Sequence, residues 1–299
     1  MTFLRSTRRA IFAAFLTVAA PLGWLAAPAL AQAPAPAESM PRAVSVADWN
    51  TLAKILREGV LRAGVRADYR PWGFRNPAGE FVGMEIEMVR DVARALGVRP
   101  EFVPVVAANR MQFLSQGQID LMIATMSDVA DRRRIVGIVH PNYYSSGFNV
   151  IMPRSVSVAD WNQLRGRQLC AIQGAWYNRP ATERFGAEIV AFTGIAEVET
   201  ALEQRRCLGW IYDDNLIAVM LASDRWKDYH QPLPSQNDTP WGLAVRLTDQ
   251  EGPWGRFMSG MVANWHRSGA LLRWEKEAGI AESPFLRRMH EAMKDHIAN

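Results

Sequence analysis

One arginine in a basic run is the side chain with the clearest potential for binding chemistry. Arg132 lies five residues after Ser127, and Thr125 and Ser127 follow directly on an apolar segment. A guanidinium group presents a planar fork that binds a carboxylate through two hydrogen bonds, and the N-terminus of a helix adds oriented amides. Alternatively, Arg132 belongs to a solvated basic cluster with Arg133 and Arg134. The charge pattern alone leaves both interpretations open.

A candidate of opposite charge follows another apolar stretch. Asp213 comes directly after the apolar residues 210–212 and before a predicted helix. Parallel sheets bind ligands at the carboxyl ends of their strands, so this carboxylate can face a cleft. An aspartate at this position is also an ordinary helix N-cap, a role that Asp214 or Asn215 could fill equally well. Which of the two aspartates faces the cleft stays open at this stage.

Aromatic residues and a glycine complete the set of candidates. Tyr69 and Trp72 flank Pro71 in a turn after an apolar strand, where they can either contact a ligand or simply pack. Gly174 lets backbone amides approach an anion, and Trp176 can offer a stacking face or fill space. The residue types alone leave open whether these aromatic residues bind a ligand or pack.

Enzyme motifs are missing from the chain. It has no Gly-x-Ser-x-Gly elbow, phosphate-binding loop or His-Glu-x-x-His motif. Its five histidines are scattered without metal-ligand spacing: His140, His230, His266, His290 and His296. The sequence therefore predicts a binding protein with no catalytic residue, no metal and no cofactor.

The elements that must position these residues alternate between strands and helices. Residues 61–65, 101–105 and 119–124 are predicted strands, with helices between them over 84–96 and 110–116. The pattern restarts after Met152, with strands over 168–173, 188–192 and 208–212 and helices over 180–186, 197–205 and 214–223. The fold class is therefore α/β with two lobes, each a mainly parallel sheet flanked by helices.

The chain crosses twice between the predicted lobes. Residues 147–152 leave the first lobe and residues 241–247 return to it, so these segments are expected to form a hinge. Helices from Trp254 onward should then pack on the first lobe. The predicted bounds are 55–148 plus 240–299 for the first lobe and 149–239 for the second, with the binding site between them.

The N-terminal segment has the features of an export signal. Three arginines precede an apolar stretch that closes on Ala29-Leu30-Ala31, which predicts a signal peptide over 1–31 that is cleaved after Ala31. The pair Arg8 and Arg9 is also compatible with twin-arginine export. Residues 32–54 are predicted to be a flexible leader. Without the signal peptide the formal net charge falls from +4 to +1, which gives no indication of a nucleic-acid surface.

The order and spacing of these segments resemble the family 3 extracellular solute-binding proteins, which are polar amino-acid receptors of ABC importers. The resemblance begins in residues 59–65, 68–72 and 81–87 and extends over roughly 55–280. Its later parts are Asn109-Arg110, the run from Gly117 to Leu121, the run from Ala124 to Ser127, Arg132 and Tyr143-Tyr144. It implies a two-lobed periplasmic-binding-protein type II fold and capture of an amino acid for a permease and ATPase complex by a periplasmic protein, expected to be a monomer.

The resemblance also implies roles for individual residues. Arg132, with Thr125 and Ser127, is expected to hold the ligand α-carboxylate, and Asp213 to receive its α-ammonium group. Tyr69 and Trp72 occupy the positions that contact the ligand side chain. Ala175 and Trp176 stand where the family commonly has hydroxyl residues after the glycine. This departure leaves the identity of the ligand open.

Two other functions are compatible with the resemblance. The same fold includes periplasmic dehydratases of the cyclohexadienyl and arogenate type, in which a carboxylate in the cleft does acid-base chemistry. A sensory module is the third possibility. Cys170 and Cys207 are the only cysteines, and export favours their oxidation. They fall on strands that are neighbours in such sheets, so a disulfide between them is predicted.

Overall fold

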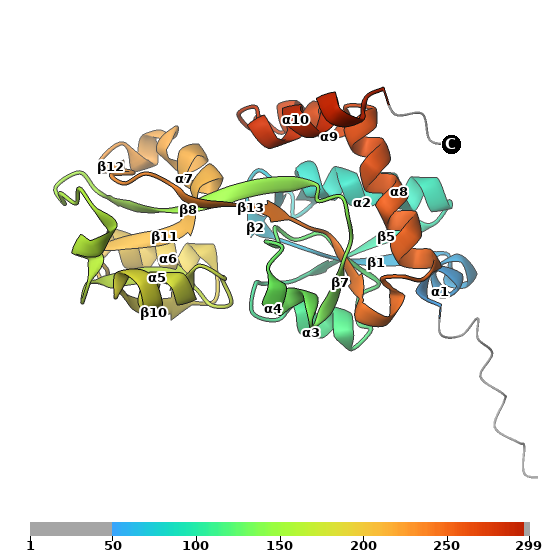
Figure 1. Cartoon of the computed structure of the whole chain (residues 1–299), viewed down its shortest axis with the longest axis horizontal. Helices are drawn as coiled ribbons and strands as arrows, with labels where there is room; N and C mark the ends of the chain where they lie inside the picture. Colours follow the sequence, from blue (N-terminus) through green and yellow to red (C-terminus); the bar gives the residue numbers. More distant parts are fainter. Residues whose placement is uncertain (1–49, 296–299) are drawn as a thin grey trace, which may run out of the picture. The chain divides into compact units, whose positions relative to one another are not determined.

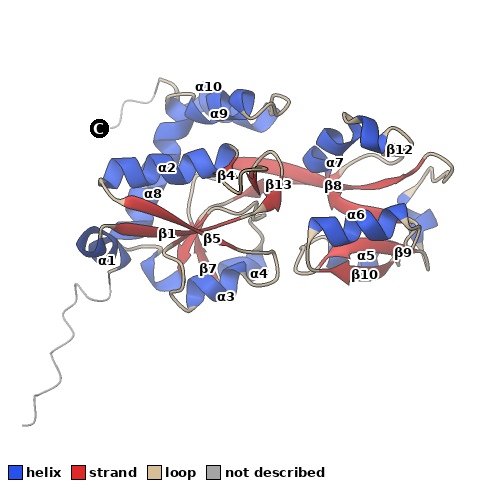
Figure 2. Cartoon of the chain, turned by 180° about the vertical axis from the view of Figure 1, so that it is seen from behind, coloured by secondary structure: helices blue, strands red, loops and turns tan. Residues whose placement is uncertain are grey.

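The protein is described here by a computed structural model that places residues 50–295 (Figures 1 and 2). The predicted signal peptide and residues 32–49 of the predicted leader lie outside this range. Residues 51–54 of that leader belong to a helix, which corrects its predicted end. Asn50 begins this helix by accepting a hydrogen bond from the backbone of Leu52, and the hydroxyl group of Thr51 donates to Asp249 at 2.6 Å.

Five strands form the first sheet, in the order β5-β1-β6-β14-β7. The central strand β1 is parallel to β5 and β6, whereas β14 is antiparallel to β6 and β7. Within the predicted strand 119–124, only two residues belong to β6, although the backbones of Asp120 and Ile123 also donate to β1. The strands are β1 (Val60–Val65), β5 (Arg99–Pro104), β6 (Leu121–Met122), β7 (Val136–Ile138) and β14 (Ala244–Arg246).

Helices cover both faces of this sheet, as the sequence pattern predicts. Figure 2 shows α2 and α3 on opposite sides of the strands. Buried residues of α2 include Met84, Met88 and Val92, and the helix ends at Gly97, whose φ of 65° is left-handed. The helices of this part are α1 (Thr51–Glu58), α2 (Met84–Leu96), α3 (Arg110–Ser115) and α4 (Ala130–Arg133). A small sheet beside them consists of β2 (Asp68–Tyr69), β3 (Gly73–Arg75) and β4 (Phe81–Val82).

The second sheet has the order β10-β9-β11-β8-β12. Its strands are β8 (Tyr144–Pro153), β9 (Gln168–Ile172), β10 (Glu188–Phe192), β11 (Gly209–Asp213) and β12 (Tyr229–His230). Its helices are α5 (Asn178–Phe185), α6 (Ile195–Glu203), α7 (Asp214–Leu221) and the 3-10 turns η2 (Trp161–Leu164) and η3 (Asp224–Trp226). The predicted two-lobed α/β fold is confirmed. Both sheets are mixed rather than mainly parallel, because β8, β12 and β14 run antiparallel to their neighbours.

Two paired strands connect the sheets. β8 carries the first predicted crossing, and β13 (Gln236–Trp241) lies antiparallel beside it (Figure 1). The second crossing is therefore at 236–241 and not at 241–247, since β14 already belongs to the first sheet. The predicted lobe boundary at 148/149 falls inside β8. The bounds of the lobes stay a prediction.

The C-terminal helices pack against the elements of the first sheet, as predicted. The indole Nε1 of Trp254 donates to the backbone oxygen of Asp120 at 2.8 Å, and that of Trp265 donates to Asp91 on α2 at 2.8 Å. These elements are η4 (Leu247–Asp249), α8 (Pro253–Arg267), α9 (Ala270–Glu277) and α10 (Pro284–Met293). No helix within residues 50–295 is long and apolar enough to cross a membrane.

The predicted disulfide is present in the second sheet. Cys170 on β9 and Cys207, two residues before β11, are bonded with their α-carbons 5.5 Å apart. Their strands are direct neighbours, with Cys170 in register with Trp210. A cross-link that closes a loop of this length stabilises the fold by roughly 4 kcal/mol in the chain-entropy model.

Candidate functional site

Residues from both lobes meet at a small cavity. Its volume is about 20 Å³, which is room for a water molecule but not for an amino acid. Five of the eight predicted ligand residues line this cavity: Thr125, Ser127, Arg132, Trp176 and Asp213. The structure thus brings together side chains that are up to 88 positions apart in the sequence.

Arg132 is buried, whereas its two basic neighbours are solvated. Only 5% of Arg132 is exposed, and its guanidinium donates to the backbone oxygens of Ser127 at 2.9 Å and Gly174 at 3.0 Å. Arg133 and Arg134 are exposed, and they pair with Asp128 and Asp131 respectively. Arg132 therefore does not belong to a solvated cluster. Its α4 has only four residues, so the contribution of a helix dipole is small.

Burial also weakens the preference of Arg132 for its charged form. Desolvation lowers the pKa of the Arg132 guanidinium to about 10, and the carboxylate of Asp213 partly opposes this effect. The side chain stays protonated at neutral pH. In residues 50–295 no carboxylate forms an ion pair with it, and the two hydrogen bonds above, to backbone carbonyls, use only part of the five N–H donors of its guanidinium.

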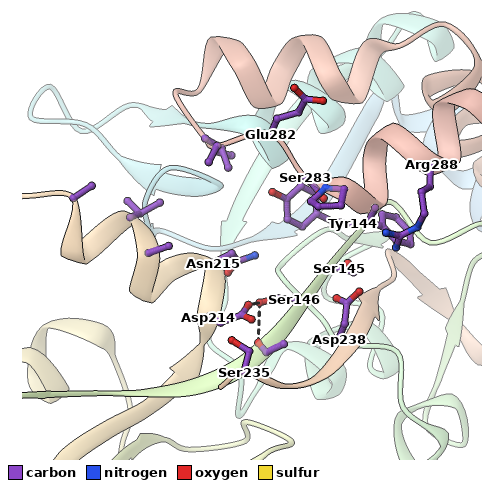
Figure 3. Close-up of a pocket in the computed structure, with 18 of the residues that line it drawn as sticks. Tyr144, Ser145, Ser146, Asp214, Asn215, Ser235, Asp238, Glu282, Ser283 and Arg288 are labelled. Atoms are coloured by element: carbon purple, nitrogen blue, oxygen red, sulfur yellow. Dashed lines mark hydrogen bonds between the residues drawn. The ribbon is translucent and has the colours of Figure 1, made fainter. Parts of the chain in front are cut away.

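Asp213 and Asp214 point to different places. Asp213 lines the cavity, is 6% exposed, and accepts a hydrogen bond from the Tyr69 hydroxyl group at 2.6 Å. Asp214 accepts from Ser146 at 2.8 Å and lines a separate pocket (Figure 3). Neither side chain caps α7, because Asp213 makes no side-chain capping bond and Asp214 is already inside the helix.

The Asp213 carboxyl group titrates near neutrality. Desolvation raises its pKa to about 7, with a further increase from Asp214, while the hydrogen bond from Tyr69 and the charges of Arg110 and Arg66 act in the opposite direction. The same contact and burial raise the pKa of Tyr69 well above its ordinary value. A cation beside Asp213 would favour its ionised form.

Three predicted residues do not line the cavity. Tyr69 reaches it only through Asp213. Trp72 is fully buried and packs edge-on against Tyr69, with ring centroids 5.5 Å apart, so it is a core residue in this structure. Gly174 has a φ of 82°, and a Cβ there would lie 2.8 Å from the backbone oxygen of Ala107. Glycine is therefore required for this close approach between the lobes.

Other residues of the cavity were not predicted from the sequence. Arg66 and Arg110 line it from the first lobe, and Tyr177 and Tyr212 line it from the second. Arg66 directly follows the buried strand β1, which was an available signal for a residue at the carboxyl edge of the sheet. Nothing in the sequence alone indicates that Arg110, at the start of α3, is only 3% exposed.

Glu85 does not line the cavity but is hydrogen-bonded to Thr125, which does. It falls on the buried face of α2, which is an unusual position for an acid and was a recognisable signal. Its carboxylate accepts hydrogen bonds from the backbone of Thr125 at 2.8 Å and from the Tyr143 hydroxyl group. Thr125 has a φ of 49°, which is rare for a β-branched residue. Glu85 thereby holds the loop after β6 in the conformation that presents Thr125 to the cavity.

Comparisons with known proteins agree with this architecture. The model of the bacterial extracellular solute-binding proteins, family 3, matches residues 61–296. The glutamine-binding protein GlnH of a Bacillus subtilis ABC transporter is 27% identical over 203 residues, covering 66% of this chain and 73% of that protein. A cyclohexadienyl dehydratase from Pseudomonas aeruginosa is 30% identical over 88 residues, covering 29% of this chain and 33% of that protein.

A solved structure shows the same fold. The cysteine-binding protein from Campylobacter jejuni has a TM-score of 0.72 at 22% identity, covering 77% of this chain and 92% of that one. Because the family model spans both sheets, the cavity residues and the C-terminal helices, the chain belongs to the bacterial extracellular solute-binding proteins, family 3.

Proposed function

We propose that this protein captures an amino acid, or a similar small zwitterion, between its two lobes and delivers it to an ABC importer. The observation that carries the proposal is a pair of buried, opposite charges on one cavity. Arg132 comes from the first lobe and Asp213 from the second, and both are more than nine-tenths buried. A zwitterion has the two groups that would satisfy both side chains.

Each partner has a defined role in this proposal. The guanidinium of Arg132 binds the α-carboxylate, together with the hydroxyl groups of Thr125 and Ser127. The carboxylate of Asp213 accepts from the α-ammonium group, and Tyr69 orients that carboxylate from its other side. Trp176 lines the cavity and provides an aromatic wall.

Ligand entry requires the lobes to separate. The cavity is too small for an amino acid, and Arg132 reaches across to the backbone of Gly174. An opening about β8 and β13 would expose both charged groups to water. A bound zwitterion would then favour the closed state, because only that state lets it contact both lobes.

A ligand screen tests this proposal. Purified protein is unfolded, washed free of bound molecules, refolded and heated with each of the common amino acids. A ligand at one hundred times its dissociation constant should stabilise the fold by about 2.7 kcal/mol, which appears as a higher melting temperature. If no amino acid raises the melting temperature, the proposal is wrong.

The transport role and the compartment extend the same proposal. One relative is named as the glutamine-binding protein of an ABC transporter, and another as a periplasmic protein that binds L-amino acids. We therefore expect a periplasmic monomer that stimulates the ATPase of its cognate permease complex. Sedimentation velocity tests the monomer, and fractionation of cells tests the compartment.

A dehydratase is a second candidate, favoured by one observation. Asp213 is a buried carboxyl group with a pKa of about 7, a value that suits a general acid at neutral pH. One partial relative is named cyclohexadienyl dehydratase. Turnover of prephenate or arogenate that is lost in Asp213→Asn would establish this activity, and its absence in the wild type would exclude it.

A further inference from the structure

Two more arginines share the cavity with Arg132 and Asp213. Arg66 is 1% exposed and Arg110 is 3% exposed, and both line the wall contributed by the first lobe. Among the charged residues that line the cavity, three are cations and one is an anion. This imbalance is large for a buried site, because an unpaired charge is costly away from water.

The charge of Arg66 is balanced by a neighbour. Its Nε and Nη2 atoms donate to one carboxylate oxygen of Asp68 at 2.9 and 2.7 Å. Arg132 and Asp213 are the expected partners of a zwitterion's two charges. Arg110 is the cation that remains without a partner in this scheme.

Arg110 has little to satisfy it within the protein. Its Nη1 atom donates to the backbone oxygen of Ala124, and its Nε atom is buried with no acceptor among residues 50–295. The nearby acid Glu85 forms no ion pair with Arg110: its Oε1 atom accepts from Thr125 and Tyr143, and its Oε2 atom is buried with no hydrogen-bond partner among the described residues. Burial and the positive charges of Arg132 and Arg66 lower the pKa of Arg110 to about 9. A bound anion would give the Nε atom an acceptor and would offset the repulsion from Arg132 and Arg66.

Resting on the function proposed above, we propose that the ligand is an acidic amino acid whose side-chain anion binds Arg110, with Arg66 beside it. The α-carboxylate and α-ammonium groups then occupy Arg132 and Asp213, and the second anion neutralises the remaining buried cation. A ligand with a cationic side chain would instead face two buried arginines of like charge. The site should therefore reject arginine and lysine and favour glutamate or aspartate over their amides.

Calorimetric titration of the ligand-free full chain tests this specificity. L-glutamate and L-aspartate are compared with L-glutamine and L-asparagine, which have nearly the same shape without the charge, and with L-arginine. A charged hydrogen bond to Arg110 should make the tighter acid bind about 10- to 100-fold more strongly than its amide. L-arginine should give no detectable heat of binding.

Variants test whether Arg110 causes the preference for the acids over their amides. Arg110→Gln should bring the acid-to-amide affinity ratio close to one, while Arg134→Gln, at an exposed position, should leave the ratio unchanged. If Arg110→Gln does not fold, as judged by circular dichroism, the ratio measured on the wild type decides. An amide or L-arginine that binds more tightly than the acids overturns this inference but leaves the proposed amino-acid capture standing. Failure of every amino acid to bind overturns both.

Discussion

The molecule has two cavities at the junction of β11 and α7, and they differ in size and in charge. The cavity that contains Asp213 has a volume of about 20 Å³, whereas the pocket lined by Asp214 has about 520 Å³ (Figure 3). The smaller one gathers buried arginines and a buried carboxyl group. The larger one is lined by Asp214 and by three charged residues that are exposed: Asp238, Glu282 and Arg288. Burial and unpaired charge, rather than volume, therefore identify the better candidate site.

The two aspartates show why such different surroundings can follow from adjacent residues. Asp213 is the last residue of β11 and Asp214 is the first residue of α7. Successive side chains at the end of a strand point in opposite directions. One carboxylate therefore meets Tyr69 in the desolvated cavity, and the other meets Ser146 in the larger pocket. Low polarity around the first strengthens every charge interaction made there.

The largest expected effect comes from removing the buried guanidinium. Arg132→Ala should weaken ligand binding by about 2 to 5 kcal/mol, because it leaves a carboxylate without its charged partner in a desolvated site. Arg134→Ala should change the binding free energy by less than about 0.5 kcal/mol, since this side chain is exposed. Titration calorimetry measures both variants. Equal losses of binding free energy in the two variants would show that the basic run attracts the ligand through its overall charge and not through a specific bond from Arg132.

The two aspartates should respond differently to the same substitution. Asp213→Ala should cost about 1.5 to 3 kcal/mol of binding free energy through loss of a charged hydrogen bond, and Asp214→Ala should have little effect. Small-angle scattering should also show a smaller radius of gyration with ligand for the wild type and for Asp214→Ala. Contraction that is retained in Asp213→Ala and lost in Asp214→Ala would move the ammonium site to the larger pocket.

The pH dependence of ligand affinity should identify the cavity that contains Asp213 as the binding site. Because the pKa of Asp213 is about 7 without ligand, its carboxylate must lose a proton before it can accept from an ammonium group at lower pH. The affinity should fall about fivefold from pH 7 to pH 6, or about 1 kcal/mol, and rise by less than about twofold from pH 7 to pH 8. Asp213→Asn should remove this dependence. A flat profile in the wild type would contradict the assignment.

The stability of the ligand-free protein should also depend on Asp213, but it should fall as the pH rises, whereas the ligand affinity should increase. The pKa of Asp213 is raised above its value in the unfolded chain, so its contribution to stability is present at low pH and is lost as the pH rises through about 7. Thermal melts of the wild type and of Asp213→Asn between about pH 4 and pH 8 isolate the contribution of Asp213 to stability. If both melting curves shift identically with pH, another group is responsible.

The smallest effect is expected in the larger pocket. Ser146→Ala removes a hydrogen bond to Asp214 and should lower the free energy of unfolding by about 1 kcal/mol while leaving ligand affinity unchanged. Chemical denaturation and calorimetry measure the two quantities separately. A clear loss of affinity would show that this pocket contributes to binding.

The sequence by itself predicted the strands and helices of both lobes well. Helix α2 follows from its apolar spacing and the glycine at its end, and the disulfide from two cysteines on neighbouring strands of a chain predicted to be exported. Helix α1 was missed because the predicted leader, which begins in the proline- and alanine-rich residues 32–37, was extended past Asn50, where this helix starts. The second crossing was misplaced because Ala244–Arg246 pairs with the first sheet, and no local pattern shows this.

For the candidate site, too, one part was predicted from the sequence and another was decided only by the tertiary structure. Residue type and spacing marked Thr125, Ser127 and Asp213 as polar groups after predicted strands, because sheet geometry fixes where strand ends lie. The family resemblance then favoured Arg132 and Asp213 as the ligand's charged partners. Only the tertiary structure decided that Arg132 is buried while Arg134 is solvated, and that Asp213 rather than Asp214 meets Tyr69. It also brought Arg110 to the same cavity. Burial depends on contacts between segments distant in the chain, and burial is what turns an ordinary charge into one that needs a partner.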